Sequence, residues 1–188
     1  MTGKEHAISN LPDERPLDLS PLRLLVVDDN RHMRELVTAI LNALEMTRVQ
    51  RACDGSEAID VLKENAIDLV ITDWLMDPVC GIQLIKWIRT SDESPDPFLP
   101  VIMISSYSTP DRVVEARNAG INEFLVKPIS ARSLYQRIAN LVERPRTFIR
   151  SKNYFGPCRR DNDGSGFHGQ ERRRQPSAPR ADGKRGMA

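Results

Sequence analysis

The sequence lacks long apolar runs, paired cysteines and any cluster of histidines. No apolar stretch approaches the roughly 18 residues of a membrane-spanning helix, and no basic-then-apolar segment marks a secretory leader. The three cysteines, Cys53, Cys80 and Cys158, show neither the paired spacing of a metal site nor the framework of a disulfide-rich secreted protein. No internal repeat is present. We therefore expect a cytoplasmic protein with reduced thiols.

Acidic and basic residues are nearly balanced in number but separated along the chain, and the formal net charge is +1. Residues 144–188 contain 12 Lys and Arg against 4 Asp and Glu, whereas residues 1–143 contain 15 against 22. The basic segment is rich in Gly, Pro, Ser and Arg and has no apolar periodicity, so it buries too little apolar surface to offset the entropy of ordering. We expect a flexible leader at 1–20, one folded domain at 21–144 and a disordered basic tail at 145–188.

Within the expected domain, short apolar runs alternate with helical patterns. Four runs are mainly apolar, as in strands that are buried on both faces, and one alternates polar with apolar residues, which suits a sheet edge. The expected strands lie at 24–27, 47–52 (the edge candidate), 67–71, 101–104 and 124–126. The clearest helical stripe runs from Met33 to Leu44, and Ser130 and Gly120 stand where a helix would begin and end. Five repeats of strand and helix predict a parallel sheet with helices on both faces.

Polar side chains follow four of these strands. Asp28 and Asp29 follow the first strand, Asp73 the third, Ser105 the fourth and Lys127 the fifth. In such sheets ligands bind beyond the carboxyl ends of the strands, so we expect these side chains to converge. Neighbouring carboxylates suit Mg²⁺, and a carboxylate can accept a phosphoryl group while a divalent ion and a lysine neutralise its charge. Singly, each acid could be solvated or cap a helix; together they predict a phosphoryl-transfer site.

Six segments of the sequence also resemble a known family in their order and approximate spacing. They are LLVVDDN, ACDGSEAIDVL, VITDWLMD, GIQLIKWIR, PVIMIS and NAGINEFLVKPI. Over about residues 22–143 the chain resembles the receiver domain of two-component response regulators, in the stand-alone, chemotaxis-regulator-like form. The resemblance implies an α/β fold of the flavodoxin-like type, a doubly wound (βα)₅ parallel sheet with strand order 2-1-3-4-5.

The resemblance assigns the phosphoacceptor and the metal ligands. Asp73 matches the residue that accepts the phosphoryl group. Asp28 and Asp29 match the acid pair that binds Mg²⁺ together with Asp73, and the backbone carbonyl of Leu75 would be a further ligand. The domain would be a phosphoacceptor in signalling, not an enzyme in the ordinary sense. A haloacid dehalogenase-type phosphatase also uses an aspartate with Mg²⁺, but its DxD motif is absent around Asp73.

The resemblance also assigns the residues that respond to phosphorylation. Ser105 matches the hydroxyl that contacts the phosphoryl group, and Lys127 matches the lysine that stabilises it. Phe124 matches the aromatic switch position, although a phenylalanine in the fifth strand could equally be an ordinary core residue. The bond before Pro128 is expected to be cis, which only X-Pro bonds adopt at low cost.

Two features depart from the family pattern without removing a site residue. Asp77 places an extra acid before Pro78, where the family often has Met-Pro, and residues 91–100 lengthen the connection before the fourth strand. We expect these differences to alter the rate of phosphoryl transfer and not its chemistry.

The expected partners are a sensor histidine kinase or a histidine phosphotransfer protein, which donates the phosphoryl group, and an unidentified downstream protein. The tail is the least explained part of the chain, because Tyr154 and Phe155 stand among arginines in RSKNYFGPCRR. It could be a solubilising segment, a docking element or a nucleic-acid-binding effector. The last possibility is the alternative function, but the absence of a helix-turn-helix or zinc-finger pattern argues against sequence-specific DNA binding.

Overall fold

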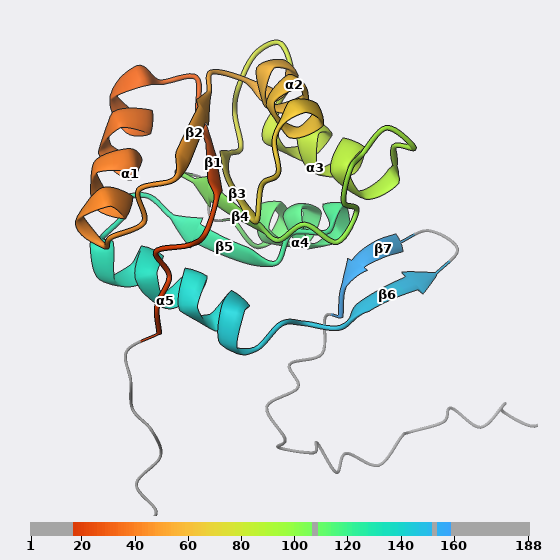
Figure 1. Cartoon of the computed structure of the whole chain (residues 1–188). Helices are drawn as coiled ribbons and strands as arrows, with labels where there is room; N and C mark the ends of the chain where they lie inside the picture. Colours follow the sequence, from red (N-terminus) through yellow and green to blue (C-terminus); the bar gives the residue numbers. More distant parts are fainter. Residues whose placement is uncertain (1–16, 107–108, 152–153, 159–188) are drawn as a thin grey trace, which may run out of the picture.

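The computed structural model describes residues 17–106, 109–151 and 154–158, in which helices cover both faces of a parallel sheet (Figure 1). The five strands of this sheet lie in the order β2-β1-β3-β4-β5, as predicted, and all four pairings are parallel. The elements are β1 (Leu24–Val27), α1 (Arg31–Ala43), β2 (Val49–Ala52), α2 (Gly55–Glu64), β3 (Leu69–Asp73), α3 (Gly81–Thr90), β4 (Val101–Ser105), α4 (Pro110–Ala119), β5 (Glu123–Val126), α5 (Ala131–Glu143), β6 (Phe148–Ser151) and β7 (Tyr154–Pro157). No helix within these ranges is long and apolar enough to cross a membrane.

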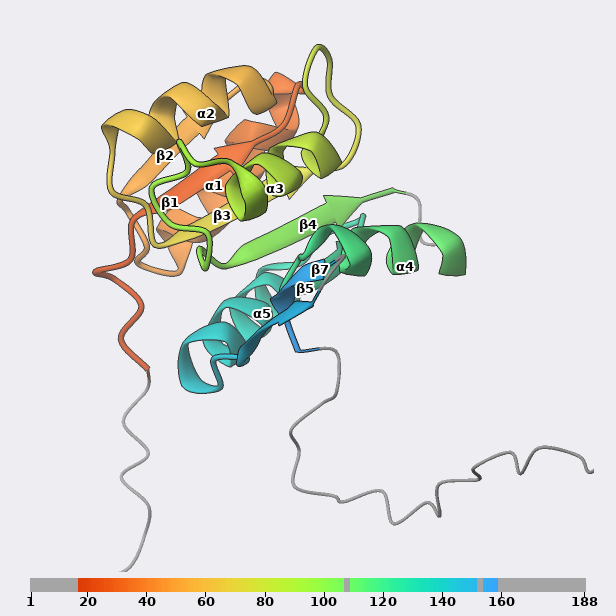
Figure 2. The same ribbon diagram turned by 90° about the vertical axis from the view of Figure 1, so that its right-hand side faces the viewer.

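Alternate side chains of each central strand enter two separate cores. In β1, Leu25 and Val27 pack with α2, α3 and α4, whereas Leu24 and Val26 pack with α1 and α5 (Figure 2). Successive side chains of a strand point to opposite faces, so a strand between two helical layers must be apolar throughout. The polar strand β2 lies at the edge of the sheet, where the sequence placed it.

Side chains cap the helices that follow β1 and β5, and a glycine ends α4. The Asn30 side chain accepts hydrogen bonds from the backbone N–H groups of His32 and Met33, so Asn30 caps α1. Ser130 caps α5 in the same way. Gly120 has a φ of 103°, the left-handed conformation that favours glycine at the end of a helix. These caps set where the loops around the carboxyl edge of the sheet begin and end.

The predicted leader is wrong at its last residues. Leu19 is only 3% exposed and packs in the core beside α1 and α5, with Leu17 and Leu22 against the same cluster. Burial of a leucine of this kind stabilises a fold by about 1.5–3 kcal/mol, which is enough to hold a short segment in place. The rest of the predicted leader, residues 1–16, lies outside the described residues.

The predicted disordered tail is also wrong at its beginning. β6 and β7 pair as an antiparallel hairpin, called the C-terminal hairpin below (Figure 1). Phe148 and Phe155 pack edge-on against Phe98, at centroid distances of 5.2 and 5.3 Å. Phe98 belongs to the lengthened connection before β4, so the two unexplained sequence features meet in space. Composition alone missed this contact because its partner lies 50 residues earlier in the chain. Residues 159–188 lie outside the described residues.

Arg89 is a buried cation beneath the C-terminal hairpin. Its guanidinium, in a residue only 3% exposed, donates hydrogen bonds to the carbonyl oxygens of Gly120, Pro97 and Leu99 and to the Asn122 side chain. Burial lowers the pKa of this guanidinium to about 10, so it remains charged at neutral pH. The ring of Phe148 lies 5.1 Å from its centre. Arg89 thereby ties the end of α3 to the connection before β4 and to the α4–β5 turn.

Candidate functional site

Three carboxylates converge at the carboxyl edge of the sheet. Asp28 and Asp29 follow β1, and Asp73 is the last residue of β3, the neighbouring strand in the sheet. Each offers one oxygen, and these three oxygens lie within 4.8 Å of one another. Asp28 is 5% exposed and Asp73 is 9% exposed, whereas Asp29 is open to solvent. The parallel pairing of β1 with β3 therefore brings together the acids that the sequence placed at two strand ends.

Lys127 follows β5 and bridges the two buried acids. Its Nζ lies 2.8 Å from Oδ1 of Asp73 and 3.1 Å from Oδ2 of Asp28. Burial lowers the pKa of Lys127, but hydrogen bonds and charge from Asp73 and Asp28 outweigh burial, and the pKa is raised above its ordinary value. Lys127 is therefore an ammonium ion at neutral pH. A positive charge thus stands beside Asp73, the carboxylate that is expected from the family resemblance to be the acceptor.

Backbone hydrogen bonds fix the orientation of the same two acids. Oδ1 of Asp28 accepts from the N–H of Asn30 at 2.9 Å, and Oδ2 of Asp73 accepts from the N–H of Leu75 at 3.1 Å. The guanidinium of Arg34, on α1, donates to the backbone carbonyl of Asp28 at 2.5 Å. Sequence reasoning missed Arg34, whose only signal was its place one turn into the helix after the acid pair. These contacts orient the carboxylates before any ligand arrives.

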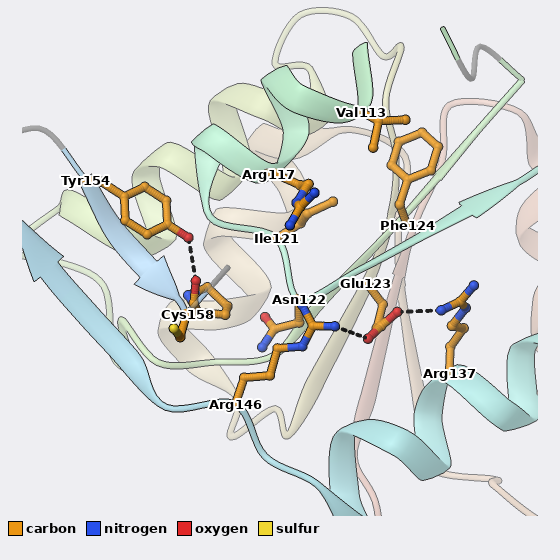
Figure 3. Close-up of a pocket in the computed structure, with 11 residues that line it drawn as sticks. Val113, Arg117, Ile121, Asn122, Glu123, Phe124, Arg137, Arg146, Tyr154 and Cys158 are labelled. Atoms are coloured by element: carbon orange, nitrogen blue, oxygen red, sulfur yellow. Dashed lines mark hydrogen bonds and ion pairs between the residues drawn. The ribbon is translucent and has the colours of Figure 1, made fainter. Parts of the chain in front are cut away.

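Ser105 and Phe124 lie on β4 and β5, the two strands that come after β3 in the order of the sheet. Ser105 ends β4 and is only 1% exposed, and Phe124 is half-buried in β5, with its ring beside Val113 of α4 (Figure 3). The Lys127–Pro128 peptide bond is cis, as expected from the sequence. Leu75 is 48% exposed beside the acid cluster. The sequence-predicted residues therefore line one edge of the sheet, with Phe124 on the path from that edge to α4.

The loop after β3 contains two features that the sequence did not predict. The Asp77–Pro78 bond is also cis. Trp74 follows the acceptor and is buried, and the guanidinium carbon of Arg112 lies 5.0 Å from the centre of its ring. Such a contact between a cation and an aromatic face is attractive. It joins the first residue after Asp73 to α4.

Comparison with known proteins agrees with this geometry. The family model of the response regulator receiver domain matches residues 24–139 of the chain. The chain belongs to this family. The chemotaxis protein CheY-3 of Vibrio cholerae is 37% identical over 123 residues, which are 65% of this chain and 93% of that protein. The chain is a CheY-like receiver. Receivers of this kind are signalling domains of two-component systems and not classical enzymes.

Solved receiver structures share the fold. A putative response regulator from Chloroflexus aurantiacus is 28% identical, with a TM-score of 0.60, and the match covers 65% of this chain and 98% of that one. The CheX–CheY–BeF₃–Mg complex of Borrelia burgdorferi is also 28% identical, with a TM-score of 0.59, and the match covers 64% of this chain and 89% of that one. The shared part ends before the C-terminal hairpin in the family match, which stops at residue 139. The hairpin is therefore an addition of this chain to the part that the family description covers.

Proposed function

We propose that the chain accepts a phosphoryl group on Asp73 from a phosphohistidine, with Mg²⁺ as cofactor, and signals through altered contacts with another protein. The observation that carries this proposal is the bridge from Lys127 to Asp73 and Asp28 beside a third carboxylate. Three acids with one ammonium ion leave an excess of negative charge that a divalent cation would balance. Oxygen ligands on Asp28, Asp29 and Asp73 are of the type that Mg²⁺ prefers. The carbonyl of Leu75 would be a further ligand.

In the proposed step, a carboxylate oxygen of Asp73 attacks phosphorus as the bond between phosphorus and the donor's imidazole nitrogen breaks. The phosphoryl group passes to Asp73, and the electron pair of the broken bond stays on the imidazole nitrogen. The N–H of Leu75 orients Asp73 for attack, since it holds the second carboxylate oxygen. Lys127 neutralises charge on the phosphoryl oxygens, and Ser105 donates a hydrogen bond to one of them. Bound Mg²⁺ would supply the remaining positive charge.

The signal would leave the site through Ser105 of β4 and Phe124 of β5. As Ser105 turns toward the phosphoryl group, space opens behind it and the half-buried ring of Phe124 moves inward. The outer surface of α4, β5 and α5 would then change its affinity for a target protein. The phosphoryl donor would be a sensor histidine kinase or a histidine phosphotransfer protein. The unit that performs this function would comprise the predicted domain, residues 21–144, extended at its start by the packed residues 17–20 and at its end by the C-terminal hairpin.

Labelling with a small phosphoryl donor tests the proposed reaction. We expect the full chain, incubated with labelled acetyl phosphate and Mg²⁺, to gain phosphate that is stable to unfolding but released by hydroxylamine, as an acyl phosphate is. Removal of Mg²⁺ with a chelator should reduce the initial rate by at least roughly tenfold, because uncompensated charge on the phosphoryl oxygens raises the barrier. Labelling that is resistant to hydroxylamine, or indifferent to the chelator, contradicts the proposal.

Magnesium should also stabilise the folded protein. A ligand that binds only the folded state raises stability by mass action, by about 2.7 kcal/mol at 100 times its dissociation constant. We expect the melting temperature to rise with Mg²⁺ concentration in the wild-type protein, and the rise to be largely lost in Asp29→Asn. Without Mg²⁺, Asp29→Asn should melt at or above the wild-type temperature, since it removes repulsion among the three acids. An equal magnesium response of both proteins in thermal denaturation would show that Asp29 is not a ligand.

The alternative function, binding of nucleic acid by the basic tail, concerns mainly residues 159–188, which lie outside the described residues. No feature of the described hairpin favours it.

A further inference from the structure

The C-terminal hairpin rests on the turn that joins α4 to β5. β7 contacts both α3 and α4. A Cβ placed on Gly156 would lie 2.9 Å from the Cα of Gly120, and a Cβ placed on Gly120 would lie 3.0 Å from the carbonyl oxygen of Phe155. The two backbones therefore approach so closely that glycine is required on both sides. The hairpin is seated at a specific position, directly over the entry to β5.

An ion-pair network joins the base of the hairpin to β5. Glu123, the first residue of β5, is 8% exposed and lies between two arginines (Figure 3). Arg137 of α5 pairs with it at 2.8 Å, and Arg146, in the segment that leads from α5 to β6, pairs with it at 3.5 Å. Glu123 directly precedes Phe124, the switch residue of the proposed function. The hairpin is thus tethered one residue away from the switch.

A pocket that is open to solvent lies between the hairpin and the switch residue. It has a volume of about 210 Å³ and is lined by side chains from α4, β5, α5 and the hairpin. Phe124 and Val113 lie at one end, and Tyr154 and Cys158 lie at the other (Figure 3). Because the pocket is open to solvent on one side, the side chains that line it can change rotamer without moving a packed core. The position of Phe124 and the seating of the hairpin therefore share one adjustable space.

The contacts that hold the hairpin are weak enough to be reversible. A two-stranded hairpin is marginally stable by itself and depends on what it packs against. Its aromatic contact, Phe98, remains 53% exposed, and the 3.5 Å separation of Arg146 from Glu123 is at the long limit of a hydrogen bond. The docked and undocked arrangements should therefore be close enough in free energy for a change at the site to shift the balance between them.

We propose that the C-terminal hairpin is a cis-acting cover of the α4–β5 corner, and that phosphorylation of Asp73 loosens it. The inference rests on the proposed function. Inward movement of Phe124 displaces the start of β5, and the longer of the two ion pairs of Glu123, that with Arg146, is the one that breaks. The freed hairpin uncovers part of the α4–β5–α5 surface for a target. The unphosphorylated protein keeps that part covered by its own chain.

Hydrogen exchange of the full chain, with and without beryllofluoride and Mg²⁺, tests the proposal. The N–H of Cys158 donates to the carbonyl of Thr147 at 2.7 Å, and the β6–β7 ladder protects its neighbours. We expect amides of residues 147–158 to exchange at least roughly tenfold faster with beryllofluoride, while amides around Asp73 and Ser105 exchange more slowly. Unchanged hairpin exchange together with slower exchange around Asp73 overturns the cover. No change in either region overturns the phosphoacceptor function instead.

A pair of neighbouring arginine substitutions separates the tether from general charge effects. Arg146→Gln removes the ion pair with Glu123, and Arg144→Gln is the control, because Arg144 is exposed and lies two residues earlier. Without beryllofluoride, Arg146→Gln should already show fast hairpin exchange, and Arg144→Gln should match the wild type. Coupling is reciprocal, so Arg146→Gln should also bind beryllofluoride about fivefold more tightly. Wild-type exchange and wild-type affinity in Arg146→Gln would contradict the proposal.

Discussion

The Asp73→Asn protein should take up no phosphate from acetyl phosphate, a loss of at least roughly a hundredfold in the extent of labelling. The amide nitrogen of asparagine cannot act as the nucleophile, and its oxygen is a poor one. Of the described carboxylates, Asp28 alone shares the contact with Lys127, and its Oδ1 is already held by the N–H of Asn30. Asp28 is therefore turned toward Lys127 and its own loop. Mass spectrometry of the hydroxylamine-treated peptide that contains residue 73 would locate the label.

The substitution should leave the fold intact. The asparagine oxygen can still accept the hydrogen bond from the N–H of Leu75, and Lys127 keeps its ion pair with Asp28. Asp60→Asn is the control, because this acid is exposed on α2 and is outside the acid cluster. It should be labelled to the wild-type extent. Labelling of Asp73→Asn at a comparable level would remove the proposed acceptor, whatever the result for the control.

The sheet and the site could be predicted because their determinants are local. The apolar run of β1 and the alternating run of β2 each report the burial of their own strand, and the parallel connections follow from the order of the elements. Asp28 and Asp73 could then be placed together, since each ends a strand and parallel strands end at one edge. Lys127 follows from the same rule. Its pairing with both acids, with the distances that set its charge, required the structure.

The C-terminal hairpin and Arg89 could not be predicted because their contacts are distant in sequence. The composition around Phe148 and Phe155 is that of an unfolded segment, and only docking on Phe98 makes a hairpin favourable. Arg89 stands in a helical pattern where an arginine would ordinarily face solvent. Its acceptors are carbonyl oxygens and one amide, which leave no trace in the sequence around it. An arginine in the last turn of a helix often binds the last carbonyl oxygens of the same helix. The position of Arg89 in α3 therefore did not indicate contacts with other parts of the chain.

The second large effect is expected for Arg89→Met, which should lower the free energy of unfolding by about 3 kcal/mol or more. Methionine fills much of the same space but donates nothing, so the carbonyl oxygens of Pro97, Leu99 and Gly120 lose the donor that Arg89 supplies. A buried polar group left without a partner costs about 1–3 kcal/mol. The loss should reach the hairpin as well, because the guanidinium lies 5.1 Å from the ring of Phe148.

Urea denaturation of Arg89→Met and Lys86→Met would show whether stability is lost because buried hydrogen bonds are removed or because a positive charge is removed from α3. Lys86 lies on the same helix, is exposed, and loses the same charge when replaced, so its stability should stay within about 0.5 kcal/mol of the wild type. Arg89→Lys should be intermediate, since one ammonium group cannot reach acceptors on three sides of a planar guanidinium. Equal midpoints for Arg89→Met and Lys86→Met would mean that water replaces the guanidinium, and that Arg89 does not hold the α4–β5 turn. With the expected order, the turn on which the hairpin rests is fixed by one side chain from α3, and only the hairpin above it is free to move.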